Sequence, residues 1–256
     1  MKTRPTLRAA ALAGLLAGAV AHVSAADSIP GPVAKKTFDA DVAFLEKGLS
    51  KTPANNAAGT LKAAAMLVAL NAQNGLGGKD DAAAAGARDK AVELALVAKK
   101  GFQKNAAEVA KAGKLAKEIA TAKSDKTEKI DLVKAGKLGL NEIMSAYRGA
   151  TVNGMNLDAD IKAYSKKVTD LDAAALVATR NMLIAMYAKD LAEDGVVSDP
   201  AKKKQWDKLT ADAISLSQEV IAETEKGPKA DKALISKKFL AINANCNACH
   251  SEFKDK

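Results

Sequence analysis

Apolar residues recur every three or four positions along most of the 256-residue chain, which is the spacing of one face of an α-helix. No proline interrupts the sequence between Pro53 and Pro200, and the breaks in the pattern fall at glycines instead. Alanine is abundant and aromatic residues make up only 4% of the chain, which favours helices packed through small side chains over a β-sandwich. We therefore predict an all-α protein with helices over about 34–50, 56–74, 80–100, 103–122, 128–148, 158–194, 200–226 and 230–253.

Capping residues support several of these boundaries. Asp199-Pro200 combines an N-cap with a proline at the first helical position. Asp125 followed three residues later by Glu128 fits a capping box with Asp in place of Ser or Thr. We expect Gly227-Pro228 to separate the last two helices, and the long sixth helix to break near Leu171.

The last predicted helix carries its apolar residues on one continuous face. Steps of four, three, four, three and four separate its members, which are Ile235, Phe239, Ile242, Cys246, Cys249 and Phe253. The two cysteines therefore share the face that points into a helical bundle, and His250 lies beside it. Core packing alone also explains the apolar members, and both roles are compatible because the same residues can line a cofactor and fill a core.

Three segments recur in the same order at offsets of 116, 119 and 118 residues. The matched pairs are 66–74 with 182–190, 38–42 with 157–161, and 89–90 with 207–208. Alanine-rich helices also resemble one another by chance, but the shared order favours an internal duplication. The first half, over 26–125, contains no cysteine, so a copy there lacks any chemistry that depends on thiols.

The N-terminus has the pattern of a cleavable secretory signal peptide over 1–25. Three basic residues precede a short apolar run, and a small-x-small site follows directly before Ala26. An uncleaved anchor is the alternative. No later segment is long and apolar enough for a membrane helix, so we expect a periplasmic or otherwise exported protein whose mature chain has no transmembrane segment.

Cleavage would remove Lys2, Arg4 and Arg8 and lower the formal net charge from +9 to +6. A modestly basic surface can steer an acidic partner protein. The lysines are scattered and aromatic residues are sparse, so we interpret the lysines as solvated helix faces and expect no nucleic-acid binding.

The five residues Cys246-Asn247-Ala248-Cys249-His250 form the C-x-x-C-H attachment pattern of a c-type haem. Two thiols one helical turn apart can each form a thioether with a haem vinyl group, and the histidine can be the proximal iron ligand. Zinc would have too few ligands, because these are the only cysteines and cleavage removes His22, the other histidine. A redox disulfide needs no histidine and lacks a βαβ context here. We therefore expect one covalently bound haem c per chain.

From Cys246 to Lys254 the sequence resembles the ending C-x-A-C-H-x-x-[FY]-[RK] of the class II c-type cytochromes, which are cytochrome c′ and its low-spin relatives. The resemblance covers about residues 128–256. It implies an antiparallel four-helix bundle over 126–256 with the haem on its last helix. Residues 26–125 then form a haem-free, repeat-like helical domain that exceeds the usual single-bundle length. Class II relatives are often dimers, so a homodimer is a candidate assembly.

The same resemblance implies that the first bundle helix places a residue over the distal face of the haem. Met144 is the candidate sixth ligand, as in the low-spin members, whereas five-coordinate members leave this position open. Methionine on an apolar helix face is also a common core filler. Three other methionines are weaker candidates: Met155, Met182 and Met186. Lys254 is either a propionate contact or an exposed terminal lysine, and Trp206 either packs in the bundle or donates its indole N–H to a propionate.

The leading interpretation is an exported mono-haem cytochrome that carries single electrons to a redox partner protein. The alternative is a haem protein with an open distal site that binds a small gas such as nitric oxide or carbon monoxide. A third interpretation gives the haem-free half the task of docking a partner. An enzyme is not expected, because no histidine remains for acid–base work and there is no Ser/His/Asp set.

Overall fold

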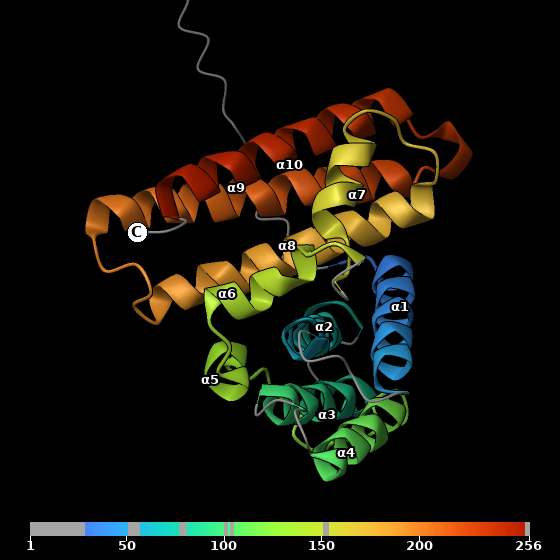
Figure 1. The fold of residues 1–256 in the computed structure, drawn as a ribbon. Coiled ribbons are helices and arrows are strands. Elements are labelled where there is room, and N and C mark those ends of the chain that lie inside the picture. Colours follow the sequence, from blue (N-terminus) through green and yellow to red (C-terminus); the bar gives the residue numbers. More distant parts are fainter. Residues whose placement is uncertain are drawn as a thin grey trace, which may run out of the picture.

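The computed structural model describes residues 29–50, 57–76, 81–99, 102, 105–150 and 154–253. Within these ranges the regular elements are all helical, as predicted. The first four long helices form one group (Figure 1). They are α1 (Gly31–Leu49), α2 (Ala57–Asn71), α3 (Ala82–Lys99) and α4 (Ala106–Glu118), and a π-helical turn (Ala72–Leu76) extends α2. We call α1–α4 the first helix group.

The second helix group contains α7 (Leu157–Tyr164), α8 (Leu171–Glu193), α9 (Pro200–Thr224) and α10 (Lys232–Phe253). The break predicted near Leu171 is present, because α7 and α8 replace the single range 158–194. Asp199 caps α9 as predicted, since its Oδ1 accepts hydrogen bonds from the backbone amides of Ala201 and Lys202 at 2.8 and 3.2 Å. Gly195, at φ +86°, follows α8, and a short 3₁₀ turn (Gly227–Lys229) separates α9 from α10.

The predicted helix over 128–148 is wrong. Three short elements replace it, namely α5 (Leu132–Gly136), α6 (Leu140–Ile143) and the 3₁₀ helix η2 (Met144–Tyr147). Lys137 adopts a left-handed conformation with φ 52° and ends α5, and Gly139 is the extended N-cap of α6.

The predicted capping box at Asp125 is also wrong, because no helix begins there. Asp131 caps α5 instead, with its side chain accepting from the amide of Lys134 at 3.0 Å. The Arg88 guanidinium donates to the carbonyls of Lys126 and Glu128 at 2.8 and 2.6 Å. These bonds hold the segment before α5 as an irregular connection on the surface of α3.

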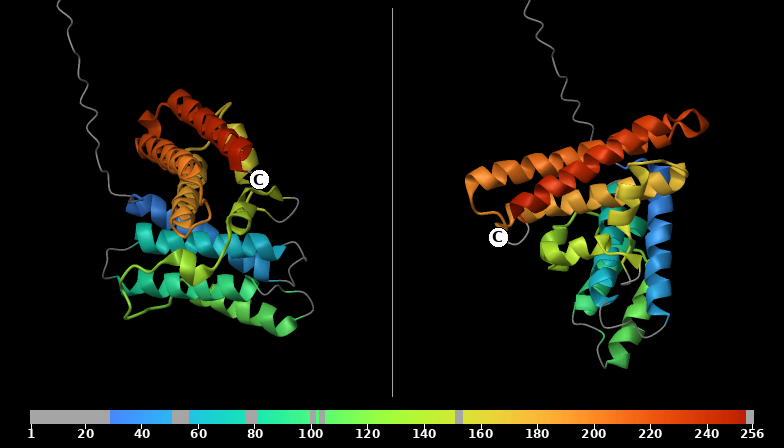
Figure 2. Two further views of the ribbon diagram at one scale, coloured as in Figure 1. Left: turned by 90° about the vertical axis from the view of Figure 1, so that its left-hand side faces the viewer. Right: turned by 45° about the horizontal axis from the view of Figure 1, so that its top comes forward.

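Both helix groups have the same order of contacts. In the first group α1 packs on α2, α2 on α3, α3 on α4 and α4 on α1; in the second, α7, α8, α9 and α10 pack in the same cycle. The matched sequence segments lie on equivalent helices, with 66–74 in α2 or its π-helical extension and 182–190 in α8. Figure 2 shows α8–α10 on one side of the molecule and α2–α4 on the other. The duplication remains a prediction, which this correspondence supports.

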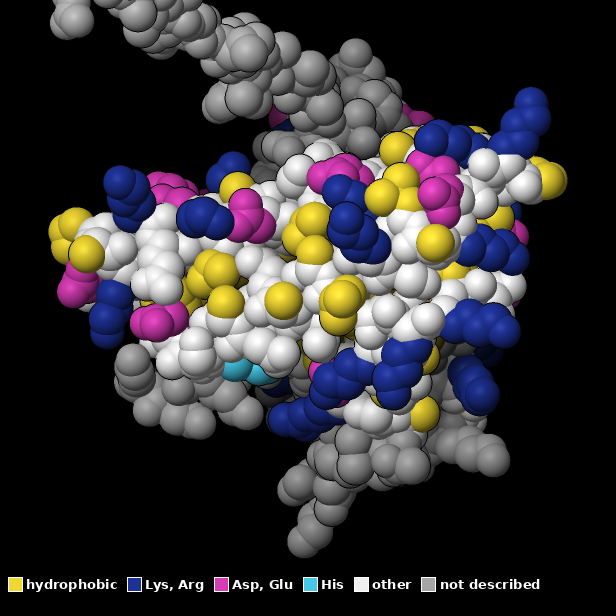
Figure 3. Space-filling model, turned by 90° about the horizontal axis from the view of Figure 1, so that it is seen from above, with side chains coloured by type: hydrophobic (Ala, Val, Ile, Leu, Met, Phe, Trp, Pro, Cys, Tyr) yellow, Lys and Arg dark blue, Asp and Glu magenta, His cyan; other side chains and the backbone are white. Residues whose placement is uncertain are grey.

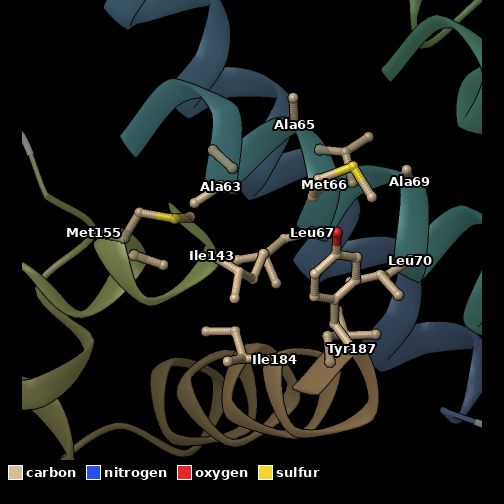
Figure 4. Close-up of a cluster of buried hydrophobic side chains, with 14 of the residues drawn as sticks. Ala63, Ala65, Met66, Leu67, Ala69, Leu70, Ile143, Met155, Ile184 and Tyr187 are labelled. Atoms are coloured by element: carbon tan, nitrogen blue, oxygen red, sulfur yellow. The ribbon is translucent and has the colours of Figure 1, made fainter. Parts of the chain in front are cut away.

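The main hydrophobic core is continuous from one helix group to the other. Figure 4 shows its centre, where Ile143 from α6 lies among Leu67 of α2 and Ile184 and Tyr187 of α8. Ile143, Leu67 and Tyr187 are all fully buried. These core side chains come from α2, α6 and α8, so α6 joins the two helix groups together with α2 and α8.

A buried ion pair also joins the groups. Asp41 of α1 is 0% exposed and Arg180 of α8 is 8% exposed. The Arg180 Nε and Nη2 atoms lie 2.8 and 2.6 Å from Asp41 Oδ1. Burial raises the pKa of Asp41, and the Arg180 guanidinium opposes that rise.

Among the described residues, no helix has the length and apolar character needed to cross a membrane. The predicted signal peptide over 1–25 and the candidate residue Lys254 lie outside the described residues.

Candidate functional site

Cys246 and Cys249 lie three residues apart near the end of α10, so their thiols project from neighbouring positions on one helix face. Both thiols are free and both residues are partly buried. Cys246 packs against the main core. Cys249 packs with Leu140 and Phe253 against a smaller cluster of Ala188, Ala192 and Trp206.

The upstream part of α10 fixes the direction of the thiols. Three residues of this part are each 0% exposed, namely Ile235, Phe239 and Ile242. The ring centroids of Phe239 and of Tyr164 on α7 are 5.4 Å apart, so the two rings pack together. Because Cys246 continues this buried stripe by one helical turn, its thiol points toward the core that the stripe fills. His250, one position past the stripe, is exposed, and its side chain is visible at the surface in Figure 3.

Trp206 on α9 closes the C-terminal end of this region. It is 2% exposed, and its ring stands edge-to-face against Phe253 with centroids 5.0 Å apart. Its indole N–H donates to the carbonyl of Ala188 at 2.9 Å. Trp206 therefore packs in the bundle, where its N–H has an acceptor, and the alternative role as a propionate donor stays a prediction.

Tyr147, at the end of η2, is a site residue that the sequence did not single out. Its phenol donates to Asn181 Oδ1 at 2.7 Å. Asn181 Nδ2 in turn donates to Ser217 Oγ at 3.0 Å, and the Ser217 hydroxyl donates to the Ala213 carbonyl at 2.8 Å. Asn181 and Ser217 are 1% and 0% exposed. This chain of hydrogen bonds runs from η2 through α8 to α9, and each donor in it has an acceptor.

Burial raises the pKa of Tyr147 and of both thiols, which share one neighbourhood. Burial raises the pKa of Cys246 to about 11, and the neighbouring Cys249 and Asp158 add to the rise. Burial likewise raises the pKa of Tyr147, and negative charge at Cys246, Cys249 or Asp158 adds to it. Asp158 of α7 is paired with Lys162 at 2.7 Å. Thus α7, η2 and α10 each contribute polar groups to one neighbourhood.

Met144 is the first residue of η2, three positions before Tyr147. It is partly buried and packs against the main core, as Cys246 does. Among the weaker methionine candidates, Met155 and Met182 are buried core residues at 6% and 0% exposure. Met186 is partly buried against the same core.

The chemistry of this neighbourhood fits a covalently held haem. Two free, partly buried thiols share a helix face, a histidine follows directly, and the side chains of Leu140 and Phe253 that share a cluster with Cys249 are apolar. The sequence predicted the thiols and the histidine because their spacing is local. It did not indicate Tyr147 or its partner Asn181, because their contact depends on how η2 meets α8.

Among the described residues, no group of three or more His, Cys, Asp or Glu side chains is arranged to hold a metal ion by itself.

Comparison with known proteins agrees with this chemistry. Residues 141–254 match the protein-family model described as Cytochrome C′. The match spans a segment of just under half the chain and contains both cysteines, His250 and Met144. It indicates a haem c-binding cytochrome segment, and the helical fold is consistent with the four-helix bundle of that family. Searches of curated proteins and of solved structures found no match.

Proposed function

We propose that this protein is an exported single-haem c-type cytochrome that transfers one electron at a time to and from a partner protein. The observation that carries the proposal is the placement of the C-x-x-C-H motif. Its two thiols are partly buried on the inward stripe of α10, and its histidine lies next to them. This arrangement supports covalent attachment of a haem against the wall of a helical bundle.

The chain's own residues have distinct tasks in this proposal. Cys246 and Cys249 would hold the haem through thioethers, and His250 would supply an imidazole nitrogen to the iron. The bound haem supplies an iron that alternates between the ferric and ferrous states. Leu140, Met144 and the Trp206 cluster exclude water from the thiol side of α10. Met144 would supply a thioether sulfur as the second protein ligand of the iron, which would raise the potential relative to a second histidine.

The second candidate function is binding of nitric oxide or carbon monoxide at an open iron position. One observation favours it: Met144 begins a four-residue 3₁₀ helix rather than lying within a long α-helix. Such short elements have few internal hydrogen bonds to hold a side chain in place.

Optical spectra of the purified protein, oxidised and reduced, test the proposal before and after Met144→Ala. We expect a low-spin, six-coordinate ferric spectrum with a thioether-to-iron charge-transfer band that Met144→Ala abolishes. Met186→Ala is the matched control, because Met186 also lies partly buried against the main core, and it should leave the band intact.

A high-spin ferric spectrum that shifts when carbon monoxide is added to the reduced protein would overturn the assignment of Met144 and favour gas binding. Haem that separates from the chain on denaturation would overturn covalent attachment, and with it the cytochrome proposal. Cys246→Ser and Cys249→Ser should each weaken the haem's retention on the denatured chain.

A further inference from the structure

The short elements just before α7 rest on the first helix group. We call Leu140–Tyr147, which comprises α6 and η2, the α6–η2 segment. At one end, Leu140 packs in the same small cluster as Cys249. At the other end, η2 contacts α7, and α7 packs on α10. The α6–η2 segment therefore lies along the haem-binding side of α10, while its packing contacts include α2.

Buried side chains join the α6–η2 segment to α2. Ile143 is 0% exposed and projects into the core between α2 and α8 (Figure 4). Ser145 is 2% exposed and lies against Gly59 of α2. A Cβ atom added at Gly59 would be 3.7 Å from the Cβ and from the Oγ of Ser145. Just before the segment, a Cβ at Gly136 would lie 2.6 Å from Met66 Sδ, so α2 also fits closely against the end of α5.

One ion pair links the start of the segment to α2. Lys62 Nζ donates to Glu142 Oε1, and the side chains are 11% and 28% exposed. The other carboxylate oxygen of Glu142 accepts the Gly139 amide at 2.9 Å, which caps α6. Glu142 thus connects the first turn of α6 to a lysine of the first helix group. A charge-assisted bond between partly buried groups is stronger and more directional than one at the surface.

We infer that the first helix group is the support for the haem site, and that Lys62 is a positioning residue that holds the α6–η2 segment, and so Met144 and Tyr147, against the haem-bearing helix. The inference rests on the proposed function for the identity of the cofactor. It assigns the haem-free half a role within the site. Lys62 itself acts through Glu142 and touches neither the thiols nor a bound group.

The test compares Lys62→Met with Lys36→Met in the full-length, haem-loaded protein. Lys36 is a matched control, because its ion pair with Asp172 at 2.8 Å also joins α1 of the first group to α8 of the second, but away from the α6–η2 segment. Hydrogen exchange is measured at the amides of Glu142, Ile143 and Arg148, which bond to the carbonyls of Gly139 and Ser145. The second measurement is the association rate of carbon monoxide with the reduced protein.

We expect Lys62→Met to speed both hydrogen exchange at these amides and carbon monoxide association by about tenfold, as for loss of one charge-assisted hydrogen bond. The ferric thioether band should weaken in parallel. Lys36→Met should match the wild type in all three measurements. Lys62→Arg should restore the wild-type values, because it retains a positive donor for Glu142.

The inference is overturned if exchange and carbon monoxide association in Lys62→Met equal those of Lys36→Met. If Lys62→Met does not fold, Glu142→Gln is tested in its place. The glutamine side-chain oxygen can still accept the Gly139 amide and cap α6, but the negative charge that pairs with Lys62 is lost. Hydrogen exchange does not depend on haem chemistry. A wild-type chain without covalent haem would therefore refute the proposed function, while exchange would still decide whether Lys62 holds the segment.

Discussion

Replacing Arg180 with methionine should destabilise the fold through a carboxylate left buried without its partner. Asp41 is 0% exposed, and the guanidinium of Arg180 is bonded to its Oδ1 through two nitrogens. The second carboxylate oxygen, Oδ2, is buried without a hydrogen-bond partner among the described residues. Methionine retains much of the apolar stem of arginine, so the change removes mainly the charge and its donors.

Loss of one member of a buried ion pair costs about 3–5 kcal/mol. We expect the lower end, about 3 kcal/mol at pH 8, because Arg180 retains some contact with solvent. At about 2–4 °C for each kcal/mol in a chain of this size, the melting temperature should fall by roughly 6–12 °C. Arg180→Met with Asp41→Leu should recover most of the loss, because a packed apolar pair needs no desolvation of charge.

The loss should also depend on pH with a defined sign. Burial raises the pKa of Asp41 above 3.8 even with Arg180 present, and removing the guanidinium raises it further. Between pH 3.8 and its own folded pKa, the folded variant therefore holds a proton that the unfolded chain has released. Its stability relative to wild type should fall as the pH rises from the folded Asp41 pKa of the wild type to the higher folded pKa of the variant, by about 1.4 kcal/mol for each unit between them.

Urea titrations followed by circular dichroism, at pH 5 and pH 8, measure these differences. Lys36→Met removes the exposed pair with Asp172 and should change the free energy of unfolding by less than about 1 kcal/mol at either pH. The reasoning is refuted if Arg180→Met costs less than about 1 kcal/mol at pH 8, or if its cost is equal at both pH values. It is also refuted if Asp41→Leu in the same chain restores nothing.

Three further predictions concern hydrogen bonds and a thiol near the α6–η2 segment. Tyr187→Phe removes the 2.9 Å bond to the Leu138 carbonyl and should lower the free energy of unfolding by about 1–2 kcal/mol in urea titrations. Tyr147→Phe leaves Asn181 Oδ1 without its donor and should cost about 1–2 kcal/mol, measured by thermal unfolding. In protein prepared without haem, the Cys246 pKa of about 11 lies above the ordinary 9.0. Stability should therefore fall from pH 9 to pH 11 more steeply than in Cys246→Ala, by urea titration.

The long helices could be predicted because their boundary signals are local. The cap at Asp199 and the glycine after α8 act within a few residues, so the sequence shows them directly. The range 128–148 failed because its apolar spacing is helical while Gly136 and Gly139 flank a left-handed lysine. Two glycines three positions apart are the signal that could have indicated the break. The packing of Ile143 between α2 and α8 is a tertiary contact that no local pattern reports.

The candidate site likewise contains residues that local spacing predicts and residues that only tertiary contacts bring together. Cys246, Cys249 and His250 follow from a five-residue spacing, and their common helix face follows from helical periodicity. Tyr147 joins them only because η2 meets α8, where Asn181 receives its proton. The packing of Trp206 depends in the same way on another helix, because the carbonyl of Ala188 on α8 accepts its indole N–H.

The burial of α2 explains why the first helix group is difficult to separate from the site. From Ala63 to Ala72 every residue is buried, although an outer helix of a bundle normally keeps a solvated face. Such a helix needs partners on all sides, and α2 finds them in α1 and α3 of its own group and in α6, η2 and α8 across the molecule. Removing the first group would uncover Ile143 and Ser145, which lie on either side of Met144. The apolar character of α2 is therefore required by its contacts with α6, η2 and α8 as well as by those within its own group.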